Sequence, residues 1–168
     1  MPQHTIPRVF VSAVSSDLRS AREVISKALT RIDCLPDEES LFATEYGEIR
    51  ELIARKIDSC QAVIHLVGRD YGGEPDLRTL PAGQPRRSWA QLEYDIAREK
   101  SRKLYMLVCD DAYPFDTAAQ PEADDKHNVQ LAHREAVLAD PDLWHTVRTT
   151  EELKQAVERM KISRRLSS

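Results

Sequence analysis

The sequence predicts an α/β fold in which helices cover both faces of a five-stranded, mostly parallel sheet. Strand-like apolar runs alternate with helical segments about five times along the chain, which is typical of folds with parallel sheets. The runs at residues 61–67 and 104–108 are also almost continuously apolar. Strands that are buried on both faces have this composition.

The first half of the chain supplies two strands and two helices. A β-branched and aromatic strand at residues 8–12 precedes a helix that continues to Ile32. Three residues offer caps at the start of that helix, namely Ser15, Ser16 and Asp17. Pro36 confines the next strand, residues 34–37, to a sheet edge. A loop through Leu41 and Phe42 then leads to a helix with apolar positions at Ile49, Leu52, Ile53 and Ile57.

The second half begins with the strand at residues 61–67 and a long loop from residue 68 to 87. Ser88 and Gln91 then form the capping-box pattern of a helix N-terminus. A second long, acidic loop is expected from residue 110 to 128. The elements predicted after it are a helix at 131–139, a short strand at 144–147, and a last helix capped by Thr149 with Glu152.

Composition bounds the classes of function. With 24 basic and 28 acidic residues the net charge is −4, and no global positive charge invites nucleic acid. The three cysteines lack metal spacing and suit buried thiols in a reducing compartment. The sequence shows no apolar signal core and no membrane-spanning run. We therefore expect a single cytoplasmic domain over residues 1–168, with its core at about 8–162 and no membrane partner.

The length and the order of elements favour a flavodoxin-like three-layer sandwich with strand order 2-1-3-4-5. Ligands of such sheets bind beyond the carboxyl ends of strands one and three, where the strand order reverses. The loops that meet there are residues 12–17 and 68–73, and the helix after Ser88 begins at the same edge. Glu93 and Trp89 are thus expected to face this crevice.

Glu93 is the candidate catalytic residue. It lies within an apolar helical stripe with Trp89, Leu92 and Ile96, and a carboxylate there is costly unless something pairs with it or uses it. Helical spacing alone favours a glutamate whose carboxylate reaches water at the edge of the helix. The convergence of three separate segments on one crevice favours the functional interpretation.

With those segments in place, the chain resembles the Toll/interleukin-1 receptor (TIR) superfamily, and most closely the TIR-like N-terminal domains of NACHT or repeat proteins. The matching pieces are residues 9–12 leading to Asp17 and Arg22, residues 67–72, and residues 88–94. In enzymatic TIR domains a glutamate at the position of Glu93 cleaves NAD. The resemblance implies an NAD glycohydrolase or cyclase of immune or stress signalling that self-associates through homotypic TIR contacts.

The chemistry also points to NAD as a substrate. Hydrolysis of an ordinary glycoside needs two carboxyl groups, one of which protonates the leaving group. The nicotinamide of NAD is already cationic and leaves as a neutral molecule, so a single carboxylate that stabilises the ribose charge suffices. No Gly-x-Gly-x-x-Gly turn follows the first strand, which argues against a bound redox cofactor. We expect no cofactor.

Several residues are candidates for substrate contact, and each has a structural explanation as well. Tyr71 and Trp89 offer stacking surfaces or packing, and Gly68 offers a turn. Arg87 offers a charge for a pyrophosphate or a solvated side chain. The substrate-binding set is Ser12, Ser15, Gly68, Tyr71, Arg87 and Trp89. No metal site is predicted, since Asp110 and Asp111 lack a third ligand and His65 reads as a core histidine.

Two alternatives remain open from the sequence. Nucleoside deoxyribosyltransferases share a flavodoxin-like sheet and a catalytic glutamate, and they break a related N-glycosidic bond. The second alternative is a non-enzymatic TIR module that signals by assembly. It stays open because Ser12-Ala13-Val14 departs from the Ser-Ser-Thr of close relatives. A response-regulator receiver is excluded because the acidic residues that it needs at the ends of strands one and three are missing.

Overall fold

The computed structural model describes residues 6–38, 43–117 and 121–162, and these contain a five-stranded sheet. Its strands are β1 (Arg8–Ser12), β2 (Leu35–Asp37), β3 (Ala62–Val67), β4 (Lys103–Cys109) and β5 (Leu143–Val147). They run in the order β2-β1-β3-β4-β5, and every neighbouring pair is parallel. The predicted flavodoxin-like fold and its strand order are therefore confirmed.

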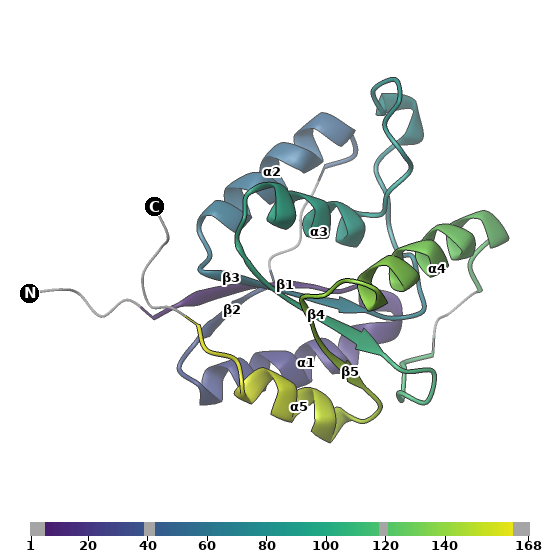
Figure 1. Cartoon of the computed structure of the whole chain (residues 1–168). Coiled ribbons are helices and arrows are strands. Elements are labelled where there is room, and N and C mark those ends of the chain that lie inside the picture. The colour runs from purple at the N-terminus through teal and green to yellow at the C-terminus, as the bar shows by residue number, and fades with distance from the viewer. Residues whose placement is uncertain (1–5, 39–42, 118–120, 163–168) are drawn as a thin grey trace, which may run out of the picture.

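Helices cover both faces of the sheet. They are α1 (Ser15–Arg31), α2 (Tyr46–Asp58), α3 (Trp89–Glu99), α4 (Asp124–Leu138) and α5 (Thr150–Glu158), with a 3-10 turn η1 (Leu77–Thr79) between β3 and α3. Helices α1 and α5 lie on one face, whereas α2, α3 and α4 lie on the other (Figure 1). None of the helices in the described ranges is long and apolar enough to cross a bilayer.

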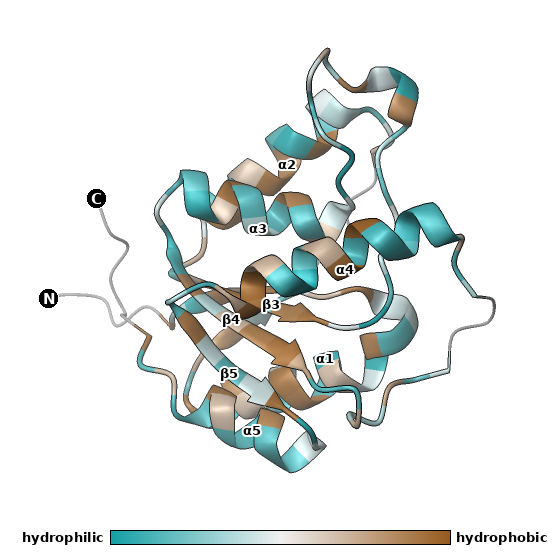
Figure 2. Ribbon diagram, turned by 45° about the vertical axis from the view of Figure 1, so that its right-hand side comes forward, coloured by the Kyte–Doolittle hydropathy of each residue, from teal (hydrophilic) through white to brown (hydrophobic). Residues whose placement is uncertain are grey.

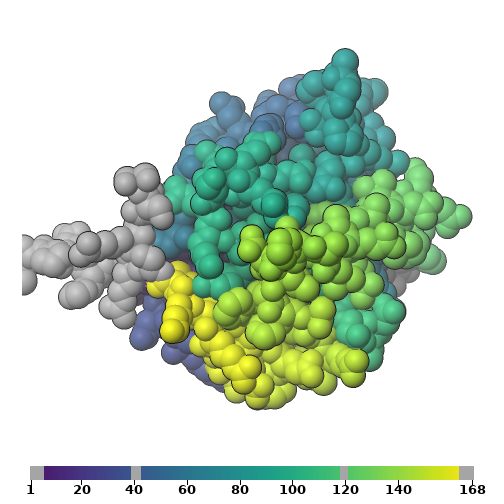
Figure 3. All heavy atoms as spheres, viewed as in Figure 1, coloured from purple at the N-terminus to yellow at the C-terminus, as the bar shows by residue number. Residues whose placement is uncertain are grey.

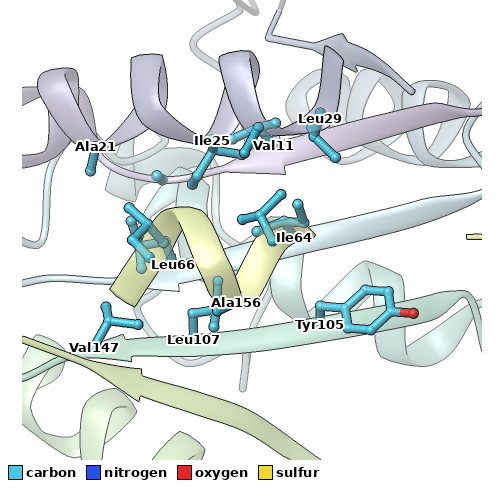
Figure 4. Packing of buried hydrophobic residues seen from close by; sticks show 14 of the residues in the cluster. Val11, Ala21, Ile25, Leu29, Ile64, Leu66, Tyr105, Leu107, Val147 and Ala156 are labelled. Atoms are coloured by element: carbon cyan, nitrogen blue, oxygen red, sulfur yellow. The ribbon is translucent and has the colours of Figure 1, made fainter. Parts of the chain in front are cut away.

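The larger core lies between the sheet and the layer of α1 and α5. Val11 of β1 and Ile64 of β3 pack there with Ile25 of α1 (Figure 4). Phe10, the neighbour of Val11, points to the opposite face and packs with α2 and α3, because successive strand residues alternate between faces. Strand β3 is buried along its whole length, which explains its continuous apolar run. Figure 2 shows these apolar strands between helices with polar outer surfaces.

Two helices begin with the predicted caps. The Ser88 hydroxyl accepts a hydrogen bond from the Gln91 backbone N–H at 3.1 Å, and Gln91 Oε1 accepts one from the Ser88 N–H at 3.2 Å. This reciprocal pair is the capping box that the sequence predicts for α3. At the start of α5, the Thr149 hydroxyl accepts from the Glu152 backbone N–H at 3.0 Å.

Helix α1 begins differently, after Val14 and without a side-chain cap. The structure thus contradicts the predicted caps Ser15, Ser16 and Asp17. Asp17 is buried, and its Oδ2 accepts hydrogen bonds from the backbone N–H groups of Arg69 at 2.8 Å and Asp70 at 3.0 Å. The carboxylate therefore ties the start of α1 to the loop after β3. Burial raises the pKa of Asp17 to about 6.

Helix α4 begins at Asp124, well before the predicted Leu131, and the preceding loop is correspondingly shorter than predicted. Asp124 and Asp125 occupy the first turn, where negative charge is favoured by the helix dipole. The first turns are otherwise polar, so apolar periodicity does not reveal them. Helix α4 lies across the face of the molecule seen in Figure 3. The loop predicted at Leu41 and Phe42 lies outside the described residues.

Candidate active site

A pocket of about 290 Å³ opens at the carboxyl ends of β1 and β3, where the strand order reverses. Its walls are residues 13–16 after β1 and residues 71–73 after β3. Helix α3 contributes Trp89, Ala90 and Glu93, and Arg22 and Glu38 complete the lining. We call this the Glu93 pocket. Its place agrees with the ligand sites of parallel α/β sheets.

The capping box positions α3 against this pocket. Beyond the box, the Trp89 backbone N–H donates to the Gly73 carbonyl at 3.0 Å. The Gln91 side chain donates to Gln130 Oε1 at 2.9 Å, and Gln130 in turn donates to the Gly68 carbonyl at 3.0 Å. These bonds fix the first turn of α3 to the loop after β3, so Trp89 and Glu93 face the pocket on successive turns.

Glu93 lies at the inner end of the pocket and is partly exposed to it. The Ser12 hydroxyl donates a hydrogen bond of 2.8 Å to Glu93 Oε1. Burial raises the pKa of Glu93 to about 7, while the Ser12 bond and the positive charge of Arg22 act in the opposite direction. A carboxyl group with this pKa changes its charge near neutral pH, as catalytic carboxyl groups do.

Arg22 of α1 is held beside the pocket by two contacts. Its guanidinium donates to the Ala13 carbonyl and forms an ion pair with Glu38 at 3.5 Å. Both Arg22 and Glu38 line the pocket, and Glu38 is exposed. The pocket therefore has a positive group at its wall, available to an anionic part of a ligand, and a second carboxylate at its rim.

Two aromatic residues line the pocket in different ways. Tyr71 is fully buried, and its hydroxyl donates to Glu74 at 2.8 Å. Burial and the neighbouring Glu74 raise the Tyr71 pKa, so the phenol stays neutral. Trp89 is half-buried and packs on Gly73, where a Cβ would lie 3.1 Å from the indole ring. Its buried indole N–H has no hydrogen-bond partner among the described residues.

The structure brings together most of the predicted site residues. Glu93, Ser15, Tyr71 and Trp89 all line the pocket. Ser12 is fully buried beneath it, where its hydroxyl contacts Glu93 and the imidazole of His65 rather than the open pocket. Glu38 was not predicted, because its position after a short edge strand carries no motif. Arg22 was predicted only through the resemblance to TIR domains.

Two predicted residues lie elsewhere. Gly68 is not part of the lining; it packs behind the pocket, where a Cβ would lie 2.7 Å from Asp17 Oδ2. Arg87 does not line it either, because its guanidinium pairs with Asp95 at 2.7 Å on the other side of α3. Asp95 follows Glu93 by two residues, which places it on the opposite side of a helix. Arg87 borders a separate groove with His133.

Other polar features of the molecule lie apart from this site. A larger hollow of about 540 Å³ borders Lys103 at the opposite end of β4, where ligands of parallel sheets do not bind. Its Arg98 and Arg102 form ion pairs with Asp140 and Asp58. The three cysteines are buried, and none of them forms a disulfide within the part of the chain that the structure describes. Within the described ranges, no three His, Cys, Asp or Glu side chains are grouped to hold a metal ion.

Comparison with curated proteins gives no match. Among solved structures, the chain is similar to a CMP N-glycosidase of Clostridium botulinum, BcmB, with 14% identity and a TM-score of 0.48. That similarity covers 90% of this chain and 98% of the other, and at this level it does not extend to activity. The resemblance to TIR domains stays a prediction. A family model described as a domain of unknown function, DUF4062, matches residues 8–161, and the chain belongs to this family.

Proposed function

We propose that this chain is an enzyme that cleaves the N-glycosidic bond of a nucleotide, with Glu93 as its catalytic carboxylate. The observation that supports the proposal is the placement of Glu93 at the inner end of the pocket, bonded to Ser12 and one turn from Trp89. Bond cleavage leaves positive charge on the ribose, and a preorganised carboxylate stabilises such charge. The indole of Trp89 offers a stacking surface for the base.

NAD is the substrate that best suits a single inner carboxyl group. Glu38, the second carboxylate of the pocket, is exposed at the rim and paired with Arg22 at 3.5 Å. Hydrolysis of an ordinary glycoside needs an acid to protonate the leaving group. Nicotinamide needs none, because its ring nitrogen is cationic before the bond breaks. Water then adds to the ribose carbon, and the products are nicotinamide, ADP-ribose and a proton.

The pKa of Glu93 supports a second substrate class. At a pKa of about 7, roughly half of the Glu93 side chains carry a proton at neutral pH. A protonated carboxyl group can donate to a neutral base as it departs, as in a nucleoside or a pyrimidine nucleotide. This chemistry corresponds to the deoxyribosyltransferase-like alternative, and it uses the same residue at the same ribose carbon.

Product analysis with a matched variant tests the proposal. The concentrated protein is incubated with NAD and separately with CMP and nucleosides, and released bases are separated by chromatography. Glu93→Gln removes the negative charge and is expected to lower turnover by roughly 100- to 1000-fold. Glu99→Gln is the control, because Glu99 lies on the same helix but is exposed and paired with Arg50. Equal turnover in Glu93→Gln and the parent contradicts the proposal, and no turnover of any substrate at any concentration favours an assembly module.

The pH dependence separates the two substrate classes. With NAD, only ionised Glu93 is useful, so kcat/KM is expected to rise through pH 7 and then level off. With a neutral base, a proton on Glu93 is needed, and the rate is expected to fall as the pH rises above about 7. Initial rates from pH 5 to pH 9 measure this difference. A flat profile for both substrates argues against a role for Glu93 ionisation.

A further inference from the structure

A chain of hydrogen bonds runs behind α3 and joins Arg87 to Glu93. Arg87 Nη2 lies 3.3 Å from His133 Nδ1, and His133 Nε2 lies 2.9 Å from His65 Nε2. On the other side of His65, Nδ1 lies 2.9 Å from Ser12 Oγ, which lies 2.8 Å from Glu93 Oε1. The chain thus connects the Arg87 groove with the Glu93 pocket through side chains alone.

The members of the hydrogen-bond chain come from β1, β3, α3 and α4 and from the loop before α3. Ser12 ends β1 and His65 is its register partner on β3, so their side chains emerge beside each other. His133 lies on α4 and packs edge-on against His65, with ring centroids 5.2 Å apart. All three are almost fully buried, with 4% exposure or less. Arg87 is anchored at its end of the chain by two bonds to Asp95, of 2.8 and 2.7 Å.

Arginine fixes the direction of these bonds because a guanidinium only donates. The Nδ1 of His133 must therefore accept, which puts the proton of that ring on Nε2. The Nε2 of His65 must then accept, which puts its proton on Nδ1. The Nδ1–H donates to Ser12 Oγ, and the Ser12 hydroxyl proton is left to donate to Glu93.

The two imidazoles are neutral, which this sequence of bonds requires. Burial lowers the pKa of His133 to about 3, and the charge of Arg87 acts in the same direction. Burial, together with the neighbouring His133 and Arg87, holds the pKa of His65 well below its usual value. Each ring therefore has one N–H and one acceptor nitrogen. A single arrangement of protons satisfies every contact from Arg87 to Glu93.

We propose that Arg87 is a positioning residue for Glu93: it sets the tautomers of His133 and His65 and thereby makes Ser12 donate to the carboxylate. Were the proton of His65 on Nε2, its Nδ1 would accept from Ser12 and take the hydroxyl proton away from Glu93. The catalytic use of this arrangement rests on the function proposed above. Its existence does not, because the tautomers are properties of the folded protein.

Other titratable groups line the Glu93 pocket, and none of those named here belongs to the hydrogen-bond chain. Arg22 approaches from α1, and Glu38 follows β2 and is paired with Arg22. Tyr71, after β3, lines the same pocket as a neutral phenol. Among the described residues, the Ser12 hydroxyl has one other acceptor nearby, the Ala90 carbonyl at 3.4 Å. The bond from Ser12 is therefore the contact at Glu93 that the chain controls.

The first test is the tautomeric state of the two histidines in the intact protein. Imidazole ¹⁵N NMR at neutral pH, with all five histidine rings assigned by through-bond correlation to their own backbone signals, is expected to show His65 protonated on Nδ1 and His133 on Nε2. The opposite tautomers, or a doubly protonated ring, overturn the proposal. This measurement needs no substrate and no substitution in the hydrogen-bond chain.

The second test replaces the fixed donor. In Arg87→Met the two histidines are expected to lose their fixed tautomers, and the pKa of Glu93 is expected to rise by about one pH unit, because one hydrogen bond to a charged group is lost. Carboxyl ¹³C NMR measures this pKa. Arg87→Lys also presents only donors and is expected to keep the parent values. Arg50→Met is the matched control, because Arg50 pairs with Glu99 at the far end of α3. An unchanged Glu93 pKa in Arg87→Met, or an equal rise in Arg50→Met, overturns the proposal.

Kinetics then separate this inference from the proposed function. In Arg87→Met the pH at which NAD turnover reaches half its plateau is expected to rise with the pKa of Glu93, and KM is expected to change little. A merely structural loss lowers the rate equally at every pH. If the tautomers are as expected but the parent turns over no nucleotide, the proposed function fails and the positioning of Ser12 stands. If turnover is present and the half-plateau pH is the same in both proteins, the positioning role of Arg87 fails.

Discussion

At the scale of single residues, Glu93 combines burial with incomplete compensation. One hydrogen bond from Ser12 and the charge of Arg22 favour the ionised carboxylate, but burial outweighs them and raises the pKa to about 7. A buried charge that lacks a direct ion pair lowers the stability of the fold. A function is a reason for a protein to retain such a residue despite this cost. The structure thus places the cost of ionising Glu93 at the position where the proposed reaction needs negative charge.

This cost predicts how stability depends on pH. The unfolded chain releases the Glu93 proton at about its ordinary pKa of 4.5, whereas the folded protein keeps it until about 7. Between these values the folded state binds more protons, so the parent loses stability as the pH rises. The glutamine of Glu93→Gln does not titrate. The free energy of unfolding of this variant, relative to that of the parent, is therefore expected to be higher at pH 8 than at pH 4 by on the order of 2 kcal/mol.

Urea unfolding of parent and Glu93→Gln at both pH values measures this difference directly. Asp17 titrates in the same range, but it is present in both proteins and cancels in the comparison. Glu99→Gln serves as the control for replacing a carboxyl group by an amide on the same helix, because Glu99 is exposed. The same stability difference at pH 4 and pH 8 contradicts the assignment of a raised pKa to Glu93.

The residues of the site were predictable from sequence to the extent that they follow helical or strand spacing. Trp89 and Glu93 lie one turn apart on a capped helix, so their common placement follows from the sequence. Arg87 lies just before that helix, where no periodicity fixes a side chain, and only the structure shows its pairing with Asp95. The chain through His65 and His133 was equally hidden, because it joins residues of β3 and α4 that no motif connects.

At the scale of elements, the loop after β3 shapes one wall of the Glu93 pocket through a conformation that favours glycine. Gly72 has φ +80°, and a Cβ there would lie 2.8 Å from Val14 Cγ1 across the pocket wall. The Tyr71 and Gly72 backbone N–H groups both donate to Glu122, at 2.6 and 2.9 Å. The loop is therefore held between the turn after β1 and the segment before α4.

Three alanine substitutions separate backbone strain from crowding. Gly47 lies in α2 with nothing near its Cβ position, so Gly47→Ala is expected to stabilise the protein by up to about 1 kcal/mol. Gly83 has φ +82° and open space, so Gly83→Ala is expected to cost roughly 1–2 kcal/mol through φ alone. Gly72→Ala adds the contact with Val14 and is expected to cost more than Gly83→Ala.

Chemical denaturation ranks the three variants, and turnover of the folded proteins adds a second readout. Gly72→Ala is expected to reduce turnover because both Gly72 and Val14 line the pocket, whereas Gly47→Ala and Gly83→Ala leave the pocket lining intact. If Gly72→Ala and Gly83→Ala lose equal stability, the contact with Val14 contributes nothing. In that case the loop is adaptable rather than fixed against the turn after β1.

The helices differ in how well the sequence predicts where they begin. Helix α3 combines a capping box with a clear apolar stripe, and both signals agree with the structure. Helix α1 carries three plausible caps, but its start is set by Asp17 bonding to another loop, a tertiary contact that local patterns do not encode. The polar first turns of α4 have no stripe to detect. Local signals therefore suffice only where tertiary contacts do not compete with them.

At the scale of the whole molecule, the fold follows from alternation and from the composition of two strands. Strands β3 and β4 lie at the centre and read as apolar runs, while the edge strand β2 contains proline. Right-handed crossovers then leave few topologies for alternating strands and helices. The strand order in turn brings the ends of β1 and β3 together, so the location of the pocket was predictable even though its full lining was not.

The size of the pocket determines how much of a nucleotide one copy of the protein can enclose. At about 290 Å³ it lies at the lower limit of small-molecule sites, and Ser15, Ser16 and Gly73 at its edge are exposed. A mononucleotide is half the size of a dinucleotide such as NAD, whose remainder would extend over this open surface. We propose that a second copy covers this open surface, as the resemblance to TIR domains that the sequence predicts would imply.

We therefore expect NAD turnover per molecule to rise with protein concentration or with a crowding agent, and CMP turnover, if present, to stay constant. Association supplies contacts to the exposed half of a dinucleotide, whereas a mononucleotide within the pocket gains nothing from a neighbour. Turnover of both substrates across a wide dilution series, together with the sedimentation coefficient at each concentration, measures the effect. Constant NAD turnover from a monomer shows that one chain holds the complete site. Rising turnover without a change in sedimentation excludes stable self-association as the cause.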